Sequence, residues 1–215
     1  VLNGLPRPLR SLSPGMMVGS GQFLSVPGLL AMALSSPPTS SPTFDPVVRA
    51  SCYLAQVRQR SPDPTWIKMA HPDHQYLAVL TWIGNHIDSL NQNFHGILAD
   101  LISCWPPHQR LPLEILVAPL NDDLGIDGFC SFQPQSTTLV VDPGRIIAVN
   151  WPQLVGHELA HAMARTAGHG ECFHAALAHL CLAQGWPLPP DRCDRLKSWP
   201  PCQPHPQPQQ FWLGN

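Results

Sequence analysis

The chain has little charge and no closely spaced pair of cysteines. Only 12% of its 215 residues are charged and the formal net charge is −2, so no basic surface for a nucleic acid is indicated. Its seven cysteines are odd in number, and no two of them form a CxxC pair. Neither a disulfide framework nor a small structural zinc module is therefore expected, which favours a reducing compartment and predicts a cytoplasmic location.

Glutamate is also scarce, with residues only at positions 114, 158 and 171. One of them lies within residues 157–161, which read HELAH. Histidines four residues apart on a helix face the same side, with Cβ atoms roughly 5–6 Å apart, so they can share one metal ion. The flanking positions of residues 154–163 are uncharged, as expected for a buried helix that holds its ligands rigidly.

A third histidine follows where the chain can fold back toward the first two. We expect the helix to begin at Asn150 and Pro152 and to end at Gly168, because glycine adopts the left-handed conformation that ends helices. His169 then emerges just after this turn. The three histidines are therefore candidate ligands of one metal ion.

The HELAH segment and residues 168–173, which read GHGECF, resemble the HExxH…HGxxF pattern of SprT-like zinc metallopeptidases, members of the zincin group. The resemblance is close over residues 155–173 and covers the preceding part of the chain only in layout. It implies that His157, His161 and His169 bind Zn²⁺ and that Glu158 is the catalytic base. No zinc-ribbon cysteine pairs follow, so the resemblance brings no argument for a nucleic-acid module.

Other zincin subtypes fit the sequence less well. Metzincins need a glycine three residues after the second histidine and a histidine three residues further on, but positions 164 and 167 are both alanine. Gluzincins take a glutamate from a helix well downstream, yet no glutamate follows Glu171. Glu171 is expected to begin the next helix, over residues 171–184, where a carboxylate favours the N-terminal dipole. His169 is therefore the better third ligand.

Three neutral imidazoles would leave a zinc ion its full charge and one open position, so that bound water becomes acidic near neutral pH. Glu158 would take a proton from this water and pass it to the leaving amine. An additional donor to the carbonyl oxygen is also expected. Arg165, His174 and His179 are the candidates, and the sequence does not choose among them.

The remaining pattern predicts an α+β fold. Apolar residues recur every three or four positions over residues 73–104, which predicts a long amphipathic helix with a possible break at Gly84-Asn85. Strands are expected over residues 113–118, 129–133 and 137–142, the last two forming a hairpin. A small zincin is built in this way, with a mostly antiparallel sheet packed against the active-site helix. Its edge strand can pair with an extended peptide, so protein or peptide segments are the expected substrates.

Two further groups of polar residues lie outside the HELAH segment and its third histidine. Asp122, Asp123 and Asp127 lie in a turn-rich segment that lacks the spacing of a calcium loop, so a solvated turn is expected. Cys202 lies among prolines near His205, and we considered that its thiol could block the open position of the zinc.

The two ends of the chain differ from the middle in composition. Residues 1–45 are predicted to be a low-complexity or disordered extension, residues 46–185 the zincin-like domain, and residues 186–215 a proline-rich tail lying across its surface. The apolar run 23–34 loosely fits a secretion signal, so export is the alternative to the cytoplasm. This run is too short to span a membrane stably.

The sequence thus predicts a zinc-dependent endopeptidase. The alternative is a catalytically silent zincin-like domain that binds or scaffolds a partner, and a weaker one is a non-peptidase amide hydrolase. The intact Glu158 favours the enzyme, because a purely structural metal site needs no base beside it. The sequence makes no prediction of the oligomeric state.

Overall fold

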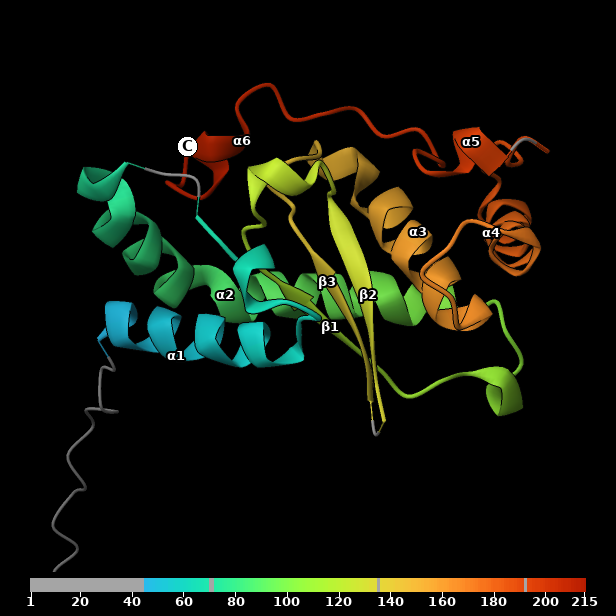
Figure 1. Cartoon of the computed structure of the whole chain (residues 1–215), viewed down its shortest axis with the longest axis horizontal. Helices are drawn as coiled ribbons and strands as arrows, with labels where there is room; N and C mark the ends of the chain where they lie inside the picture. Colours follow the sequence, from blue (N-terminus) through green and yellow to red (C-terminus); the bar gives the residue numbers. More distant parts are fainter. Residues whose placement is uncertain (1–44, 70–71, 135, 192) are drawn as a thin grey trace, which may run out of the picture. The chain divides into compact units, whose positions relative to one another are not determined.

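The computed structural model describes residues 45–69, 72–134, 136–191 and 193–215. The predicted N-terminal extension, with its signal-like run 23–34, lies outside the described residues apart from Asp45. The remaining elements combine helices with one sheet, so the predicted α+β class is confirmed (Figure 1). The helices are α1 (Pro46–Arg60), α2 (Asp73–Ile102), α3 (Trp151–Ala164), α4 (Glu171–Gln184) and the short α5 (Cys193–Leu196) and α6 (Pro208–Phe211); the strands are β1 (Leu113–Val117), β2 (Gly128–Gln133) and β3 (Ser136–Val141).

The sheet has the strand order β1-β3-β2. The predicted hairpin is present, with β2 and β3 antiparallel from Gly128 opposite Val141 to Gln133 opposite Ser136. However, β1 pairs with β3 in parallel, so the expectation of a mostly antiparallel sheet is wrong and the sheet is mixed. Strand β3 lies between β1 and β2, so β2 is an edge strand of the sheet. A parallel pairing of this kind joins strands that are not consecutive, and local periodicity carries no signal for it.

Helix α2 is the longest element and runs without a break through Gly84, so the predicted interruption is wrong. The glycine serves packing instead, because a Cβ at position 84 would overlap the backbone carbonyl of Pro46 at the start of α1. Helix α2 packs against α1, β1 and α3, while α3 packs against β2 and β3 and carries α4 on its other side (Figure 1).

Helix α1 was not predicted from the sequence. The Asp45 side chain caps it by accepting a hydrogen bond from the backbone N–H of Val47 at 2.8 Å, and Pro46 occupies the first turn. Its buried face comprises Ala50, Leu54 and Val57. This spacing of four and three residues is helical and was visible in the sequence.

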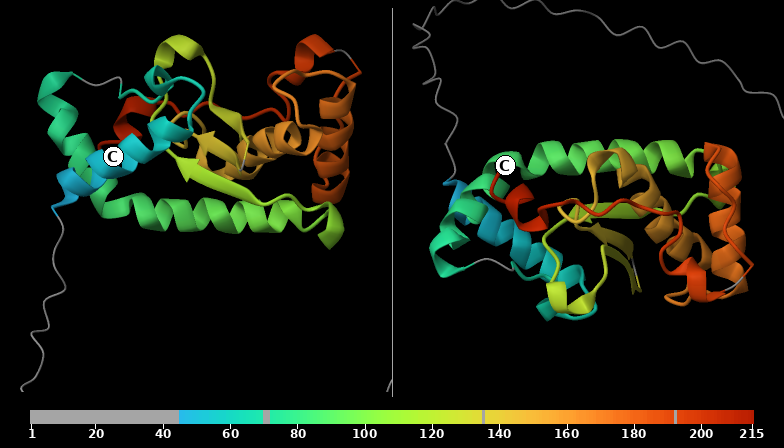
Figure 2. Two further views of the ribbon diagram at one scale, coloured as in Figure 1. Left: turned by 60° about the horizontal axis from the view of Figure 1, so that its bottom comes forward. Right: turned by 90° about the horizontal axis from the view of Figure 1, so that it is seen from above.

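The C-terminal segment 186–215 belongs to the same compact unit as the rest of residues 42–215. It crosses the molecule from α4 to the neighbourhood of α2 (Figure 2). A β-bridge joins Pro204 to Ile146, and Trp212, only 3% exposed, donates a hydrogen bond from its indole N–H to the carboxylate of buried Asp142 at 3.0 Å. The predicted tail is therefore a packed part of the domain in its described residues.

The described helices include none that is long and apolar enough to cross a membrane.

Candidate metal centre

Helix α3 places His157 and His161 one turn apart, with ring centroids separated by 5.0 Å. As predicted, the helix follows Asn150 and has a proline in its first turn. Asn150 does not cap the helix through its side chain. Instead, its amide oxygen accepts a hydrogen bond from the backbone N–H of Gln203 at 2.9 Å, which ties the C-terminal segment to the start of α3.

The end of α3 differs from the prediction. The helix ends at Ala164, and Arg165, not Gly168, adopts the left-handed conformation, with φ at 51°. The chain then turns back and brings His169 to the other two histidines. Its ring centroid lies 5.2 Å from that of His157 and 4.7 Å from that of His161.

The ligand atoms of the three histidines all lie within 4.8 Å of one another. The Nε2 atoms of His157 and His169 are 3.2 Å apart. Two nitrogens bound tetrahedrally to one zinc ion, each at about 2.0–2.1 Å, would be separated by about 3.3 Å. The spacing of this nitrogen pair therefore fits a shared metal ion.

Backbone carbonyl groups fix the orientation of two of the rings. The Nδ1 of His157 donates to the carbonyl of Trp199 at 2.7 Å, and the Nδ1 of His161 donates to the carbonyl of Thr166 at 2.8 Å. Since a carbonyl oxygen can only accept, the proton of each neutral ring sits on Nδ1 and the lone pair sits on Nε2. Such outer contacts set the tautomer and direction of metal-binding histidines in general.

Phe173 at the start of α4 packs against the rings of all three histidines. It is fully buried, and its ring centroid lies 4.3–5.0 Å from those of the three histidines. Burial lowers the pKa of His157 and of His161 to about 4, and it lowers that of His169 as well. All three rings are therefore neutral near pH 7, which is the form that binds a metal.

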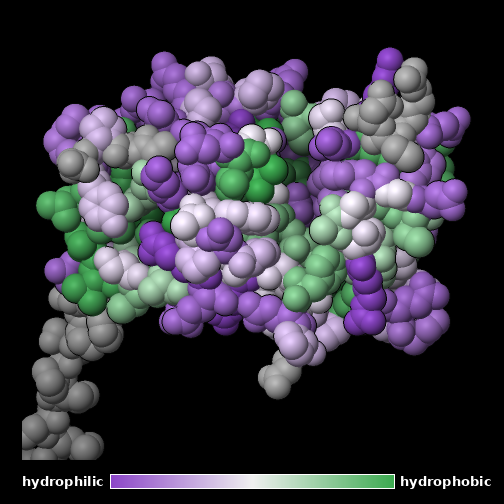
Figure 3. Space-filling model, in the orientation of Figure 1, coloured by the Kyte–Doolittle hydropathy of each residue, from purple (hydrophilic) through white to green (hydrophobic). Residues whose placement is uncertain are grey.

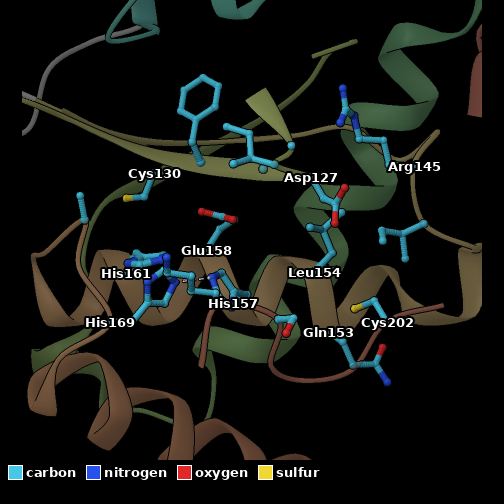
Figure 4. A pocket seen from close by; sticks show the side chains of 18 of the residues that line it. Asp127, Cys130, Arg145, Gln153, Leu154, His157, Glu158, His161, His169 and Cys202 are labelled. Atoms are coloured by element: carbon cyan, nitrogen blue, oxygen red, sulfur yellow. Dashed lines mark hydrogen bonds between the residues drawn. The ribbon is translucent and has the colours of Figure 1, made fainter. Parts of the chain in front are cut away.

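Glu158 follows His157 on α3 and projects into the cavity close to the histidines (Figure 4). It is 4% exposed, and its Oε2 atom has no hydrogen-bond partner among the described residues. Without a metal ion, burial, with a smaller contribution from the charge of Asp127, raises its pKa to about 8, and a divalent cation on the histidines would favour the ionised form that can act as a base. Such a buried and unpaired carboxyl group is costly in a folded protein, so it marks a place where a ligand or a reacting group is expected.

The cavity beside Glu158 has a volume of about 1090 Å³. Strand β2 lines one side and residues 197–202 of the C-terminal segment line another, with the three histidines at one end. Figure 3 shows the molecule from the same side as Figure 1. On this side, a hollow bordered by hydrophobic residues separates the central part of the surface from the part formed by α3 to α5. The site is therefore open to a ligand much larger than water.

None of the three residues considered as donors to a carbonyl oxygen lines this cavity. Arg165 is exposed at the end of α3, and His179 lies against Trp105 and the carbonyl of Cys104. His174 is on α4, with a buried Nε2 atom that has no partner among the described residues. Those assignments are therefore not supported by the geometry.

The thiol of Cys202 does not point to the histidines either. It lies 3.4 Å from the carbonyl oxygen of Pro200 and 3.9 Å from that of Asn150, and it donates to them. Burial raises its pKa to about 11, so it stays protonated and is a poor ligand. The suggestion that Cys202 blocks the metal is therefore wrong for this structure. The C-terminal segment contacts the site through the backbone of Trp199 instead.

Sequence reasoning missed three contributors to the site. The carbonyl of Trp199 has no residue-type signature, so no sequence signal could have revealed it. Gly128 lies so close to Glu158 that an added Cβ would be 3.0 Å from its Oε1, and a glycine at the start of a strand was a usable signal. Asp122, Asp123 and Asp127 are exposed, as expected of a solvated turn, but the position of Asp127 at the cavity was not predicted.

Comparison with known proteins adds nothing to this geometry, since no family model, no curated protein and no solved structure matches the chain. The arrangement itself can hold one metal ion on three neutral histidines and leaves a carboxyl group beside it.

Proposed function

We propose that this protein is a zinc-dependent endopeptidase of the SprT-like zincin type, with His157, His161 and His169 as the zinc ligands and Glu158 as the general base. The observation that carries the proposal is the meeting of three neutral imidazoles and one unpaired buried carboxyl group at one end of a large cavity. Three nitrogen ligands with a fourth position left open are typical of catalytic zinc sites, whereas structural sites use four protein ligands.

When bound, a zinc ion would lower the pKa of a water molecule and polarise the scissile carbonyl group. The side chains and backbone of the protein orient the metal ligands and transfer protons. Glu158 accepts the proton of the attacking water and delivers it to the leaving nitrogen. The carbonyls of Trp199 and Thr166 keep the Nε2 atoms of His157 and His161 directed at the site.

Strand β2 supports the proposal for an extended peptide substrate. It pairs with β3 on one side, and no other described strand covers its second edge. Residues 128–133 of this strand line the cavity that contains Glu158. A peptide that adds to this edge would run past the metal site, with its backbone held by hydrogen bonds of the sheet type. A cytoplasmic location is also part of the proposal, because the number and spacing of the cysteines favour a reducing compartment.

The test combines zinc analysis with a casein or peptide-library assay on wild type, Glu158→Gln and Glu171→Gln. Glu158→Gln should keep one equivalent of zinc and lose peptide hydrolysis by about 10²–10⁴-fold, the usual contribution of a general base. Glu171→Gln is the matched control, because Glu171 is exposed at the start of α4 and should leave both readouts unchanged.

A silent binding domain makes a different prediction. Wild type would then bind zinc or a protein partner without cleaving any peptide, and Glu158→Gln would behave as wild type. That result would reject the peptidase proposal and support the silent binding domain. Zinc binding that survives His169→Ala unchanged would instead refute the proposed ligand set.

A further inference from the structure

Asp127 is an acidic side chain in the cavity that the proposed chemistry does not use. It directly precedes β2, and its carboxylate points into the cavity on the side away from the histidines (Figure 4). Its backbone carbonyl is held by the N–H of Asp142 at 2.8 Å. In the described part of the chain, no group forms a hydrogen bond or an ion pair with its side chain. Asp127 is a solvent-exposed residue, so its carboxylate is accessible to a ligand that enters the cavity.

Arg145 acts electrostatically on Asp127, but its ion pairs are made with other carboxylates. Arg145 donates to the carbonyl of Leu120 and pairs with Asp122 at 2.8 Å and with Asp142 at 3.3 Å. Its single charge is therefore shared by two other carboxylates. The second cation at the cavity is Lys197, and it acts electrostatically on His169 at the opposite end. Asp127 thus has an electrostatic attraction to Arg145 but no ion pair among the described residues.

Apolar side chains line much of the cavity, together with the polar Arg145 and Gln153. Leu154 lies next to Asp127 (Figure 4), and Ile146, Trp66 and Phe129 also line the cavity, the last two with ring centroids 5.1 Å apart. Apolar walls suit a hydrocarbon stem, while an unpaired carboxylate suits a cationic end. Lysine and arginine side chains combine both features.

We propose that this end of the cavity is the subsite for a lysine or arginine residue next to the scissile bond, and that Asp127 is the partner of its charge. The proposal rests on the peptidase function proposed above and names its substrate class. A substrate strand antiparallel to β2 would pass Glu158 near Gly128 and then reach Asp127, which places the basic residue on the C-terminal side of the bond. We expect this direction, since antiparallel pairing is slightly more stable and more common.

The experiment compares fluorogenic peptides that differ in one residue, which is arginine, citrulline or glutamate. Citrulline has the shape of arginine without its charge. Zinc-loaded wild type should show a kcat/KM about tenfold higher for arginine than for citrulline, which corresponds to about 1.4 kcal/mol, and the lowest value for glutamate. Asp127→Asn should reduce the preference for arginine to less than about twofold, and Asp127→Lys should favour glutamate. Asp123→Asn removes an equal charge from a residue that is exposed like Asp127 but does not line the cavity, and it should keep the preference of wild type.

Equal kcat/KM for arginine and citrulline peptides in wild type, or an unchanged preference in Asp127→Asn, would overturn this inference while leaving the peptidase intact. If wild type cleaves none of the peptides, the peptidase proposal fails. The subsite is then decided by binding of labelled peptides to Glu158→Gln, measured by fluorescence anisotropy. Tighter binding of arginine than of citrulline that Asp127→Asn abolishes supports the subsite, and equal affinities reject it.

Discussion

The contact between Gly128 and Glu158 gives the sharpest prediction for a single substitution. An ideal Cβ on Gly128 would lie 3.0 Å from the Cγ and Oε1 atoms of Glu158 and 3.0 Å from the carbonyl oxygen of Val140. Unstrained carbon contacts lie at about 3.5–4.0 Å, so Gly128→Ala requires a displacement of about 0.5 Å or more. Val140 is held in the central strand β3, so most of the movement falls on the side chain of Glu158.

A misplacement of about 1 Å can reduce catalysis by about 10²-fold. We therefore expect Gly128→Ala to lower kcat/KM for peptide hydrolysis by about tenfold or more, while the zinc content stays at the wild-type level because none of the three histidines is touched. The added methyl group should also cost about 1–3 kcal/mol of unfolding free energy, the usual range for overpacking.

The matched control is Gly96→Ala. Gly96 is exposed in α2, and no heavy atom lies within 4 Å of the Cβ position. This substitution should stabilise the helix by about 0.5–1 kcal/mol and leave kcat/KM unchanged. The assays are steady-state peptide hydrolysis, zinc analysis and urea unfolding of both variants. Full activity of Gly128→Ala would show that Glu158 does not need its present position, and the reasoning would be wrong.

Two further predictions concern stability. In the metal-free protein, the pKa of His157 and of His161 lies at about 4 because of burial, against 6.5 in the unfolded chain, so the unfolded state binds more protons between these values. The unfolding free energy, measured in urea with a chelator present, should therefore fall as the pH drops from about 6.5 to about 4, and a rise on acidification would contradict the assigned neutral rings. Trp212→Ala removes a buried ring and its hydrogen bond to Asp142, so it should lower the unfolding free energy by about 3–5 kcal/mol. The control is Leu182→Ala at an exposed position, which should change the unfolding free energy by no more than about 0.5 kcal/mol. Equal effects of the two alanine substitutions would show that the C-terminal segment does not contribute to the folded domain.

The sequence predicted those parts of the fold that depend on neighbouring residues. The helices around the HELAH segment, the long helix α2 and the hairpin of β2 and β3 all follow from periodicity and turn residues within short windows. Helix α1 carries the same kind of signal and was nevertheless overlooked, although Asp45 and Pro46 mark its start.

The parts that failed depend on contacts between distant residues. The parallel pairing of β1 with β3 and the left-handed turn at Arg165 are set by how the chain packs, not by local propensity. At the site, residue type and spacing were enough to propose His157, His161 and Glu158. Spacing could not reveal the carbonyl of Trp199, because every residue has such a group and only the fold selects one of them.

The link between His157 and Trp199 also bears on when the site can be complete during synthesis. The two residues are 42 positions apart, so a ribosome that has finished α3 has not yet made the acceptor that orients its first histidine. The growing chain therefore acquires this arrangement only after Trp199 has been synthesised. A nonsense mutation between the codons of Ala164 and Trp199 would release a protein in which the HELAH segment is intact but its first imidazole lacks this hydrogen-bond acceptor.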